Sequence, residues 1–542
     1  MKGKSAVAKA LKMEGVDFIT GFPSNALLEA VAQEGIRTIQ PRTERVAINI
    51  ADGFTRASFG ERHGVSIMQY GPGIENSFAG VAHAFADSVP ILLLPGAPER
   101  RRLLPPNFIA MFNYREITKW VDLINFADRV PEMMRRAFHH LKNGRPAPVM
   151  LELPVDVAEE EFDDALFRYT PARSYRSGGD PADVKKVAQL LLKAECPVIR
   201  AGQGVHYARA WRELRELVEL LQIPIYTTMN GKSAFPESHP LSLGTGGRGR
   251  PRAVLHFHEK ADLIFAIGSS CTIEHFTTPI PAGKRVVQST IDERDLSKDY
   301  PLEHAIIGDA KLVLRQLIDE VKSQLGIGKR DGSAWSREIK EVKTAWLKDW
   351  MPKLTSDEIP INPYRIVWDM MQAFNEKETI VTHDSGNPRE QLLPFYVSDT
   401  PGSYIGWGKS TTMGQSLGLT MGAKLACPEK TCVHFIGDGS FGMVGMDFET
   451  AVREQIPIIT IVLHNSTLSG HAANYPTAHK QYRFTSVSGD YAKIAAALGG
   501  YSEVVRRPEE IIPALQRAKQ ANKKGMAALV EVVTRVESDY SK

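Results

Sequence analysis

The region from residue 434 to residue 465 constrains the fold of this chain more than any other. An apolar run ends in a Gly-Asp-Gly turn at residues 437–439, a helical pattern follows, and a second apolar run ends in Asn465. This is the pattern of a βαβ unit with an oxygen-bearing side chain at the end of each strand. Because the ends of neighbouring parallel strands meet at one edge of a sheet, Asp438 and Asn465 can reach one cation. These oxygens and the glycine-rich turn suit Mg²⁺ bound to a diphosphate.

The same turn also fits the glycine fingerprint of dinucleotide-binding proteins, since residues 437–442 read Gly-Asp-Gly-Ser-Phe-Gly after a strand. That fingerprint requires an acidic residue at the end of the second strand to hold a ribose, but here the strand ends in His464 and Asn465. Asp438 would also lie beside the pyrophosphate, where only a metal ion makes a carboxylate tolerable. We therefore favour a metal–diphosphate site over a nicotinamide dehydrogenase, with an ordinary strand–helix turn as the third alternative.

Short apolar runs alternate with helical patterns along the sequence, which predicts an α/β fold of three doubly wound domains with parallel sheets. An acidic and then Arg/Ser/Gly-rich stretch at 158–184 indicates a linker, and a charged helical stretch near 329–360 precedes the last unit. The predicted domains are residues 1–165, 185–328 and 361–542. Strands expected in the first domain include 18–21, 65–69, 91–94 and 148–153, and the second domain is opened by residues 197–204 and continued by residues 261–268.

The bulk composition excludes several classes of protein. A chain of 542 residues is long enough for about three domains. Its net charge of +3 and the lack of a basic stripe with aromatic residues argue against a nucleic-acid partner. The 4 cysteines are scattered without metal-site spacing, which fits a reducing cytoplasm. No apolar run is long enough for a membrane span, and the N-terminus lacks the apolar core of a signal peptide.

A second candidate group lies near the start of the chain. Residues 43–54 predict a helix that begins with Thr43 as its N-cap, so Glu44 stands in the first turn. A carboxylate at that place can simply be one that the helix dipole stabilises. It can also serve as an acid–base group in an apolar wall. The apolar stripe that predicts one buried face consists of Val46, Ala47, Ile50, Ala51 and Phe54.

The Gly-Asp-Gly turn followed by Asn465 resembles the signature of the thiamine diphosphate enzymes, most closely the acetolactate synthase-like branch of carboligases and decarboxylases. The resemblance covers nearly the whole chain, because Gly21-Phe-Pro23, Gly71-Pro-Gly73 and the loop 408–413 are similar to the cofactor loops of that family. It implies thiamine diphosphate and Mg²⁺ as cofactors. FAD is not expected, since the arginine–aspartate pattern of FAD-binding acetolactate synthases is not recognisable near residues 268–275.

The resemblance also implies roles for individual residues. Glu44 is expected to hydrogen-bond the pyrimidine ring at N1′ and so drive the 4′-amino group to the imino form that deprotonates thiazolium C2. Gln69 is a second catalytic candidate, and Met413 is expected to wedge between the two rings of the cofactor. The expected metal ligands are Asp438, Asn465 and the carbonyl of Thr467. The expected cofactor contacts are Pro23, Gly73, Asn76, Asn387, Thr411, Met413, Gly437, Gly439 and Ser440.

The activity implied by the resemblance is the making or breaking of a C–C bond next to a carbonyl in a small molecule, such as 2-oxo acid decarboxylation or carboligation. The alternatives are a simple 2-oxo acid decarboxylase, a 2-hydroxyacyl-CoA lyase and an inert thiamine diphosphate-binding regulator, against which Glu44 argues. In this family the pyrimidine-binding domain (here 1–165) and the diphosphate-binding domain (here 361–542) of different chains build one site. A homodimer or homotetramer is therefore expected.

Overall fold

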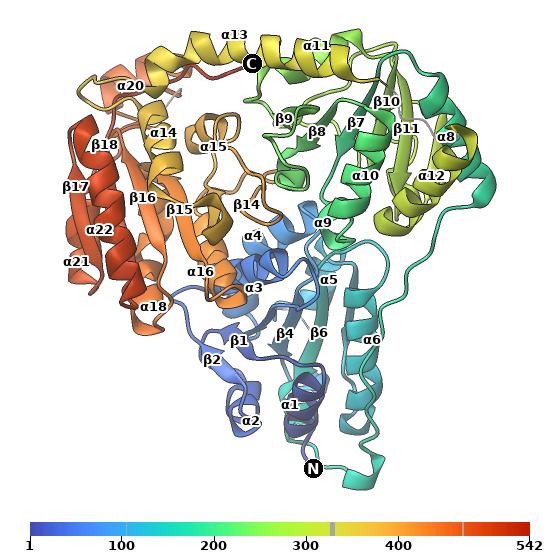
Figure 1. Ribbon diagram of the computed structural model, residues 1–542. Coiled ribbons are helices and arrows are strands. Elements are labelled where there is room, and N and C mark those ends of the chain that lie inside the picture. The colour runs from blue at the N-terminus through green and yellow to red at the C-terminus, as the bar shows by residue number, and fades with distance from the viewer. Residues whose placement is uncertain (105, 326–330, 469–470) are drawn as a thin grey trace.

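The computed structural model describes residues 1–104, 106–325, 331–468 and 471–542. Within these residues the chain forms three six-stranded, all-parallel sheets, one after another along the sequence, each flanked by helices. Figure 1 shows the first unit in blue to cyan, the second in green to yellow-green and the third in gold to red. The predicted α/β class with three parallel-sheet domains is confirmed. The domain boundaries stay a prediction, and the expected boundary at residue 328 lies outside the described residues.

The first unit has the strand order β2-β1-β3-β4-β6-β5. Its strands are β1 (Phe18–Gly21), β2 (Arg37–Ile39), β3 (Val65–Met68), β4 (Leu92–Ala97), β5 (Trp120–Leu123) and β6 (Val149–Pro154). Its helices are α1 (Gly3–Met13), α2 (Leu27–Gln33), α3 (Glu44–Ala57), α4 (Pro72–Ala86), α5 (Ala110–Asn113), α6 (Val130–Lys142) and α7 (Val155–Glu159).

The second unit has the order β12-β11-β10-β7-β8-β9. Its strands are β7 (Pro197–Ala201), β8 (Ile225–Thr228), β9 (Ser242–Gly246), β10 (Leu263–Ile267), β11 (Arg285–Thr290) and β12 (His304–Ile307). Its helices are α8 (Pro181–Lys193), α9 (Gly204–Tyr207), α10 (Trp211–Leu221), α11 (Arg252–Lys260) and α12 (Ala310–Leu325), and the long helix that follows is α13 (Ser333–Leu354).

The third unit has the order β14-β13-β15-β16-β18-β17. Its strands are β13 (Thr379–His383), β14 (Tyr404–Ile405), β15 (Thr431–Gly437), β16 (Ile459–His464), β17 (Tyr501–Val505) and β18 (Ala528–Val533). Its helices are α14 (Pro363–Ala373), α15 (Asn387–Leu392), α16 (Ser416–Ala426), α17 (Asp438–Val444), α18 (Phe448–Arg453), α19 (His471–Asn474), α20 (Pro476–Tyr482), α21 (Tyr491–Ala497) and α22 (Ile511–Lys523).

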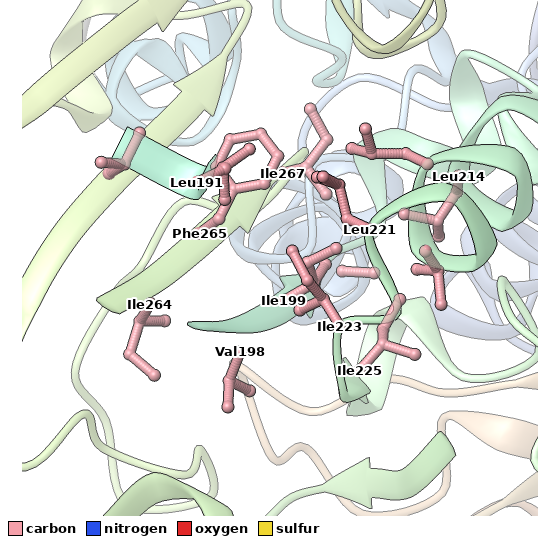
Figure 2. Packing of buried hydrophobic residues seen from close by; sticks show 14 of the residues in the cluster. Leu191, Val198, Ile199, Leu214, Leu221, Ile223, Ile225, Ile264, Phe265 and Ile267 are labelled. Atoms are coloured by element: carbon pink, nitrogen blue, oxygen red, sulfur yellow. The ribbon is translucent and has the colours of Figure 1, made fainter. Parts of the chain in front are cut away.

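The central strands are buried on both faces, which explains why they read as continuous apolar runs. Figure 2 shows part of the core of the second unit, where Ile199 of β7, Ile225 of β8 and Ile267 of β10 lie near Leu214 and Leu221 of α10. Among the described helices, none combines the length and apolar character needed to cross a lipid bilayer. All four cysteines are free thiols.

Helices α3 and α16 join the first unit to the third and lie side by side (Figure 1). Their backbones touch at glycines. A Cβ on Gly53 would lie 2.0 Å from the carbonyl oxygen of Leu419, and one on Gly422 would lie 2.1 Å from that of Ile50. Since Glu44 begins α3 and the loop with Met413 leads into α16, this contact fixes both segments relative to each other.

Candidate active site

The predicted metal side chains lie at the carboxyl ends of neighbouring strands. Asp438 follows β15 and Asn465 follows β16, and these two strands pair in parallel. One carboxylate oxygen of Asp438 accepts backbone N–H groups from Asn465 at 3.0 Å and Ser466 at 2.6 Å, and the other accepts from Gly439 at 2.8 Å. Burial raises the pKa of Asp438, and these hydrogen bonds oppose that shift. The carboxylate is therefore held in one orientation at the strand end.

A cavity of about 730 Å³ opens over these strand ends. Every candidate residue predicted in the third unit lines it: Asn387, Thr411, Met413, Gly437, Asp438, Gly439, Ser440, Asn465 and Thr467. The structure therefore brings these residues together around one cavity, and their binding roles stay predictions. Of the described residues that line this cavity, none belongs to the first unit.

The chemistry of this cavity fits a metal–diphosphate. Asp438 and Asn465 supply a carboxylate and an amide oxygen, which are hard ligands suited to Mg²⁺. Gly439 lies close to two side chains of the cavity, because a Cβ there would lie 2.6 Å from a terminal methyl of Leu468, which would have to shift, and 3.6 Å from the terminal methyl of Met413. The side-chain amide of Asn387 already makes one hydrogen bond within the protein, since its nitrogen donates to the carbonyl oxygen of Glu537 at 2.8 Å.

The predicted catalytic group of the first unit is also assembled. Thr43 caps α3 as expected, because its hydroxyl accepts the backbone N–H of Val46. Glu44 is only 8% exposed, and its carboxylate accepts the side-chain amide of Asn76 at 3.3 Å. A Cβ on Gly73 would lie 3.1 Å from Cβ of Gln69 and 3.4 Å from a carboxylate oxygen of Glu44. Glu44, Gln69, Gly73 and Asn76 thus form one cluster beside the end of β3.

Pro23 lies in the turn after β1, the strand that pairs with β3. The next residue, Ser24, has φ 79°, a conformation that favours glycine. The side chain of Asn25 ties this turn to β3 by donating to the carbonyl of Met68 at 2.8 Å. Serine therefore keeps a backbone shape for which glycine is the usual residue.

Two residues that sequence reasoning did not assign support the loop that carries Met413. Asp384, fully buried after β13, accepts the backbone N–H groups of Gly414 at 3.0 Å and Ser416 at 3.1 Å. Arg45, next to Glu44, donates through Nη2 to the carbonyl oxygen of Met413. Asp384 could have been found from the sequence, because it is a carboxylate that directly follows an apolar run typical of a buried strand. No local pattern points to the contact between Arg45 and Met413.

A second cavity of about 550 Å³ lies over the second unit. Gly202, Gly204 and Gly268 line it beside the ends of β7 and β10, and Arg145 and Lys409 reach it from the first and third units. The expectation that no FAD binds stays a prediction.

Comparison with known proteins assigns the chain to a class. Models of the N-terminal, central and C-terminal domains of thiamine pyrophosphate enzymes match residues 1–117, 184–317 and 384–532. The chain therefore belongs to the thiamine pyrophosphate (thiamine diphosphate) enzyme family.

Curated relatives indicate the branch of this family to which the chain belongs. The chain is 33% identical to a probable acetolactate synthase large subunit of Methanocaldococcus jannaschii, over 96% of this chain and 90% of the relative. It is 27% identical to the acetolactate synthase isozyme 3 large subunit of Escherichia coli K12, over 98% and 94%. It is 28% identical to glyoxylate carboligase of Escherichia coli O157:H7, over 96% and 90%. The protein is an enzyme of the acetolactate synthase-like branch, and its cofactor is thiamine diphosphate with Mg²⁺.

Proposed function

We propose that this enzyme is a carboligase that releases CO₂ from a 2-oxo acid and joins the remaining fragment to a second carbonyl compound. The relatives named acetolactate synthase and glyoxylate carboligase support this reaction class. The observation that carries the proposal is the gathering of the predicted diphosphate and metal residues around one cavity that is large enough for a cofactor and a small substrate.

The third unit would hold the diphosphate end of the cofactor. Asp438, Asn465 and the carbonyl of Thr467 would bind Mg²⁺, while Ser440 and Asn387 would contact the diphosphate. Met413 would keep the two rings of the cofactor bent. Bound thiamine diphosphate supplies the electron sink needed to make or break a C–C bond next to a carbonyl. The protein contributes position and electrostatics.

The first unit would serve the other end of the cofactor. Glu44 stands at the start of a buried helix, and Asn76 donates to its carboxylate. We assign to Glu44 the hydrogen bond to the pyrimidine ring and the sharing of a proton with it. Gln69 and Pro23 lie at the ends of the adjacent strands β3 and β1, where they would contact the pyrimidine end and the substrate.

A homodimer is the smallest functional unit under this proposal. No described residue of the first unit lines the diphosphate cavity, so the cluster around Glu44 does not contribute to its wall within one chain. Two chains related by a twofold axis would bring the first unit of each to the third unit of the other. A homotetramer would contain two such dimers.

The metal assignment is tested by replacing Asp438 with alanine. We expect Asp438→Ala to lose retention of thiamine diphosphate in the presence of Mg²⁺, because this carboxylate would hold the ion to which the diphosphate binds. Isothermal calorimetry measures the affinity. Asp357→Ala is the control, since Asp357 lies just before the third unit, its side chain is 89% exposed and its ion pair at 2.9 Å is with Arg365 of that unit. Undiminished binding by Asp438→Ala would refute the metal site.

The reaction is tested with pyruvate, benzoylformate and branched 2-oxo acids, each with and without an aldehyde acceptor. The proposal expects CO₂ release together with a new C–C product. CO₂ release without a coupled product would identify a simple decarboxylase instead. Activity only on acyl-CoA thioesters would identify a 2-hydroxyacyl-CoA lyase.

A further inference from the structure

The two residues immediately before Glu44, at the start of helix α3, form hydrogen bonds with the third unit of the same chain. Asp447, at the end of a short helical turn before α18, accepts the backbone N–H of Arg42 at 2.7 Å and the hydroxyl of Thr43 at 3.4 Å. Asp447 is only 2% exposed. The position of Glu44 is therefore set by contacts with the same unit that carries the Met413 loop.

The residue after Glu44 makes a second contact with that unit. The guanidinium of Arg45 donates through Nη2 to the carbonyl oxygen of Met413, while its buried Nε has no hydrogen-bond partner among the described residues. Asp384 lies near Arg45 and attracts its charge. Since Asp384 also accepts the N–H groups of Gly414 and Ser416, the segment from Met413 to Ser416 is held by Arg45 at one end and by Asp384 along its length.

Glu44 and Arg45 make different contacts although they are neighbours in sequence. Successive side chains leave a helix about 100° apart, since there are about 3.6 residues per turn. Glu44 contacts Gly73 and Asn76 of the first unit, whereas Arg45 reaches Met413 of the third. If a site combines the first unit of one chain with the third unit of the other, these two side chains belong to different sites.

We propose that Arg45 is a positioning residue that fixes the Met413 loop of its own chain, so that the first turn of each α3 serves both sites of the dimer. Glu44 acts in the site completed by the partner's third unit. Arg45 positions the Met413 loop of its own chain. That loop belongs to the second site of the dimer, to which the partner contributes its glutamate. This inference rests on the shared site of the proposed function and adds a physical connection between the two sites.

Single substitutions test the positioning role. A hydrogen bond from a charged donor to a carbonyl contributes about 1.5–3 kcal/mol, so we expect Arg45→Met to weaken thiamine diphosphate binding about ten- to a hundredfold. In the cofactor-free dimer, the amides of residues 411–416 should exchange with deuterium faster. Arg45→Lys should restore part of both effects, because a lysine can still donate to the carbonyl of Met413.

Arg42→Met is the matched control. Arg42 lies three positions earlier, its side chain is 47% exposed, and its guanidinium makes a surface ion pair with Glu449 at 3.2 Å. Because its contact with Asp447 uses the backbone, the control keeps that contact. Cofactor affinity and amide exchange should match the wild type in Arg42→Met. Wild-type values of both quantities in Arg45→Met would overturn the inference.

Hybrid dimers with two affinity tags test which site Arg45 serves. In the first hybrid one chain carries both Glu44→Gln and Arg45→Met, and the other chain is wild type. In the second hybrid one chain carries Glu44→Gln and the other carries Arg45→Met. The proposal expects the second hybrid to keep one fully wild-type site, measured as the fast phase of deuterium exchange at C2 of the bound cofactor. The first hybrid should have no site with the wild-type rate.

Two other outcomes would contradict the inference. Equal fast phases in both hybrids would show that Arg45 has no positioning role. A fast phase confined to the first hybrid would show that Arg45 serves the same site as Glu44. Failure of the shared site of the proposed function is recognised by a separate experiment. If each site were built within one chain, a hybrid of Glu44→Gln with Asp438→Ala would contain no intact site and would not regain activity.

Discussion

Single residues already show how burial changes chemistry, and Glu152 is the clearest case. This carboxylate on β6 is 2% exposed and accepts the backbone N–H of Met111 at 2.8 Å. Burial raises the pKa of Glu152 to about 7, and the hydrogen bond opposes the shift. Between the ordinary pKa of a glutamate and this value, the folded state binds the proton more tightly than the unfolded state. Glu152 therefore contributes less stability as pH rises through that window.

The expected result is that Glu152→Gln is more stable than the wild type at pH 8 but not at pH 4.5. The glutamine stays neutral, so it avoids the cost of a buried charge, which is on the order of 1–3 kcal/mol at high pH. Thermal midpoints of both proteins across this range provide the measurement. A difference in midpoint that does not depend on pH would show that Glu152 titrates normally.

The sequence was informative about residues whose signal is local. Asp438 and Asn465 follow buried strands, and Glu44 follows an N-cap, so their placement could be predicted. The contact of Arg45 with Met413 joins positions 368 apart in sequence. No local pattern records such a pair, because it depends on how two units pack. The catalytic and metal-binding roles of the predicted residues stay predictions until they are measured.

At the scale of elements, the contact between α3 and α16 determines how the two cofactor-binding units meet. Apolar side chains of both helices, such as Ile50 and Leu417, share one core cluster. The helix starting at Thr43 was predicted from its apolar stripe and is confirmed as α3. The backbone contact at Gly53 was not predictable, since a glycine within a helical pattern gives no sign of what lies opposite.

We expect Gly422→Ala to destabilise the protein and weaken binding of thiamine diphosphate. The new Cβ would lie 2.1 Å from the carbonyl oxygen of Ile50, which is backbone and cannot rotate away. The helices must separate, at a cost of about 1–3 kcal/mol or more, and the Met413 loop moves relative to α3. Thermal midpoint and calorimetric affinity measure the two effects.

Gly442→Ala is the control for this substitution. Gly442 lies in α17, and a Cβ there would meet nothing within 4 Å. Because alanine favours a helix over glycine, the control should be neutral or slightly stabilising. If Gly422→Ala behaved like Gly442→Ala, the close contact of α3 with α16 would not determine the arrangement of the two units.

For the whole molecule, the alternation of apolar runs and helical patterns was sufficient to predict three parallel-sheet units. The arrangement of the units could not be predicted, because it depends on backbone approach between α3 and α16 and on buried pairs. One such pair joins Asp87 of the first unit to the backbone N–H of Lys409 in the third at 3.1 Å. These contacts leave the Glu44 cluster outside the diphosphate cavity of its own chain.

The central claim is that each active site takes Glu44 from one chain and the metal ligands from another. The most direct test mixes two inactive variants, Glu44→Gln and Asp438→Ala, and measures carboligation by the reassembled dimers. In a hybrid dimer one site receives both defects and the other receives neither. With random pairing, about a quarter of wild-type activity should return, as expected for a symmetric dimer with two shared sites. No activity above that of the separate variants, although hybrids form, would contradict the shared site.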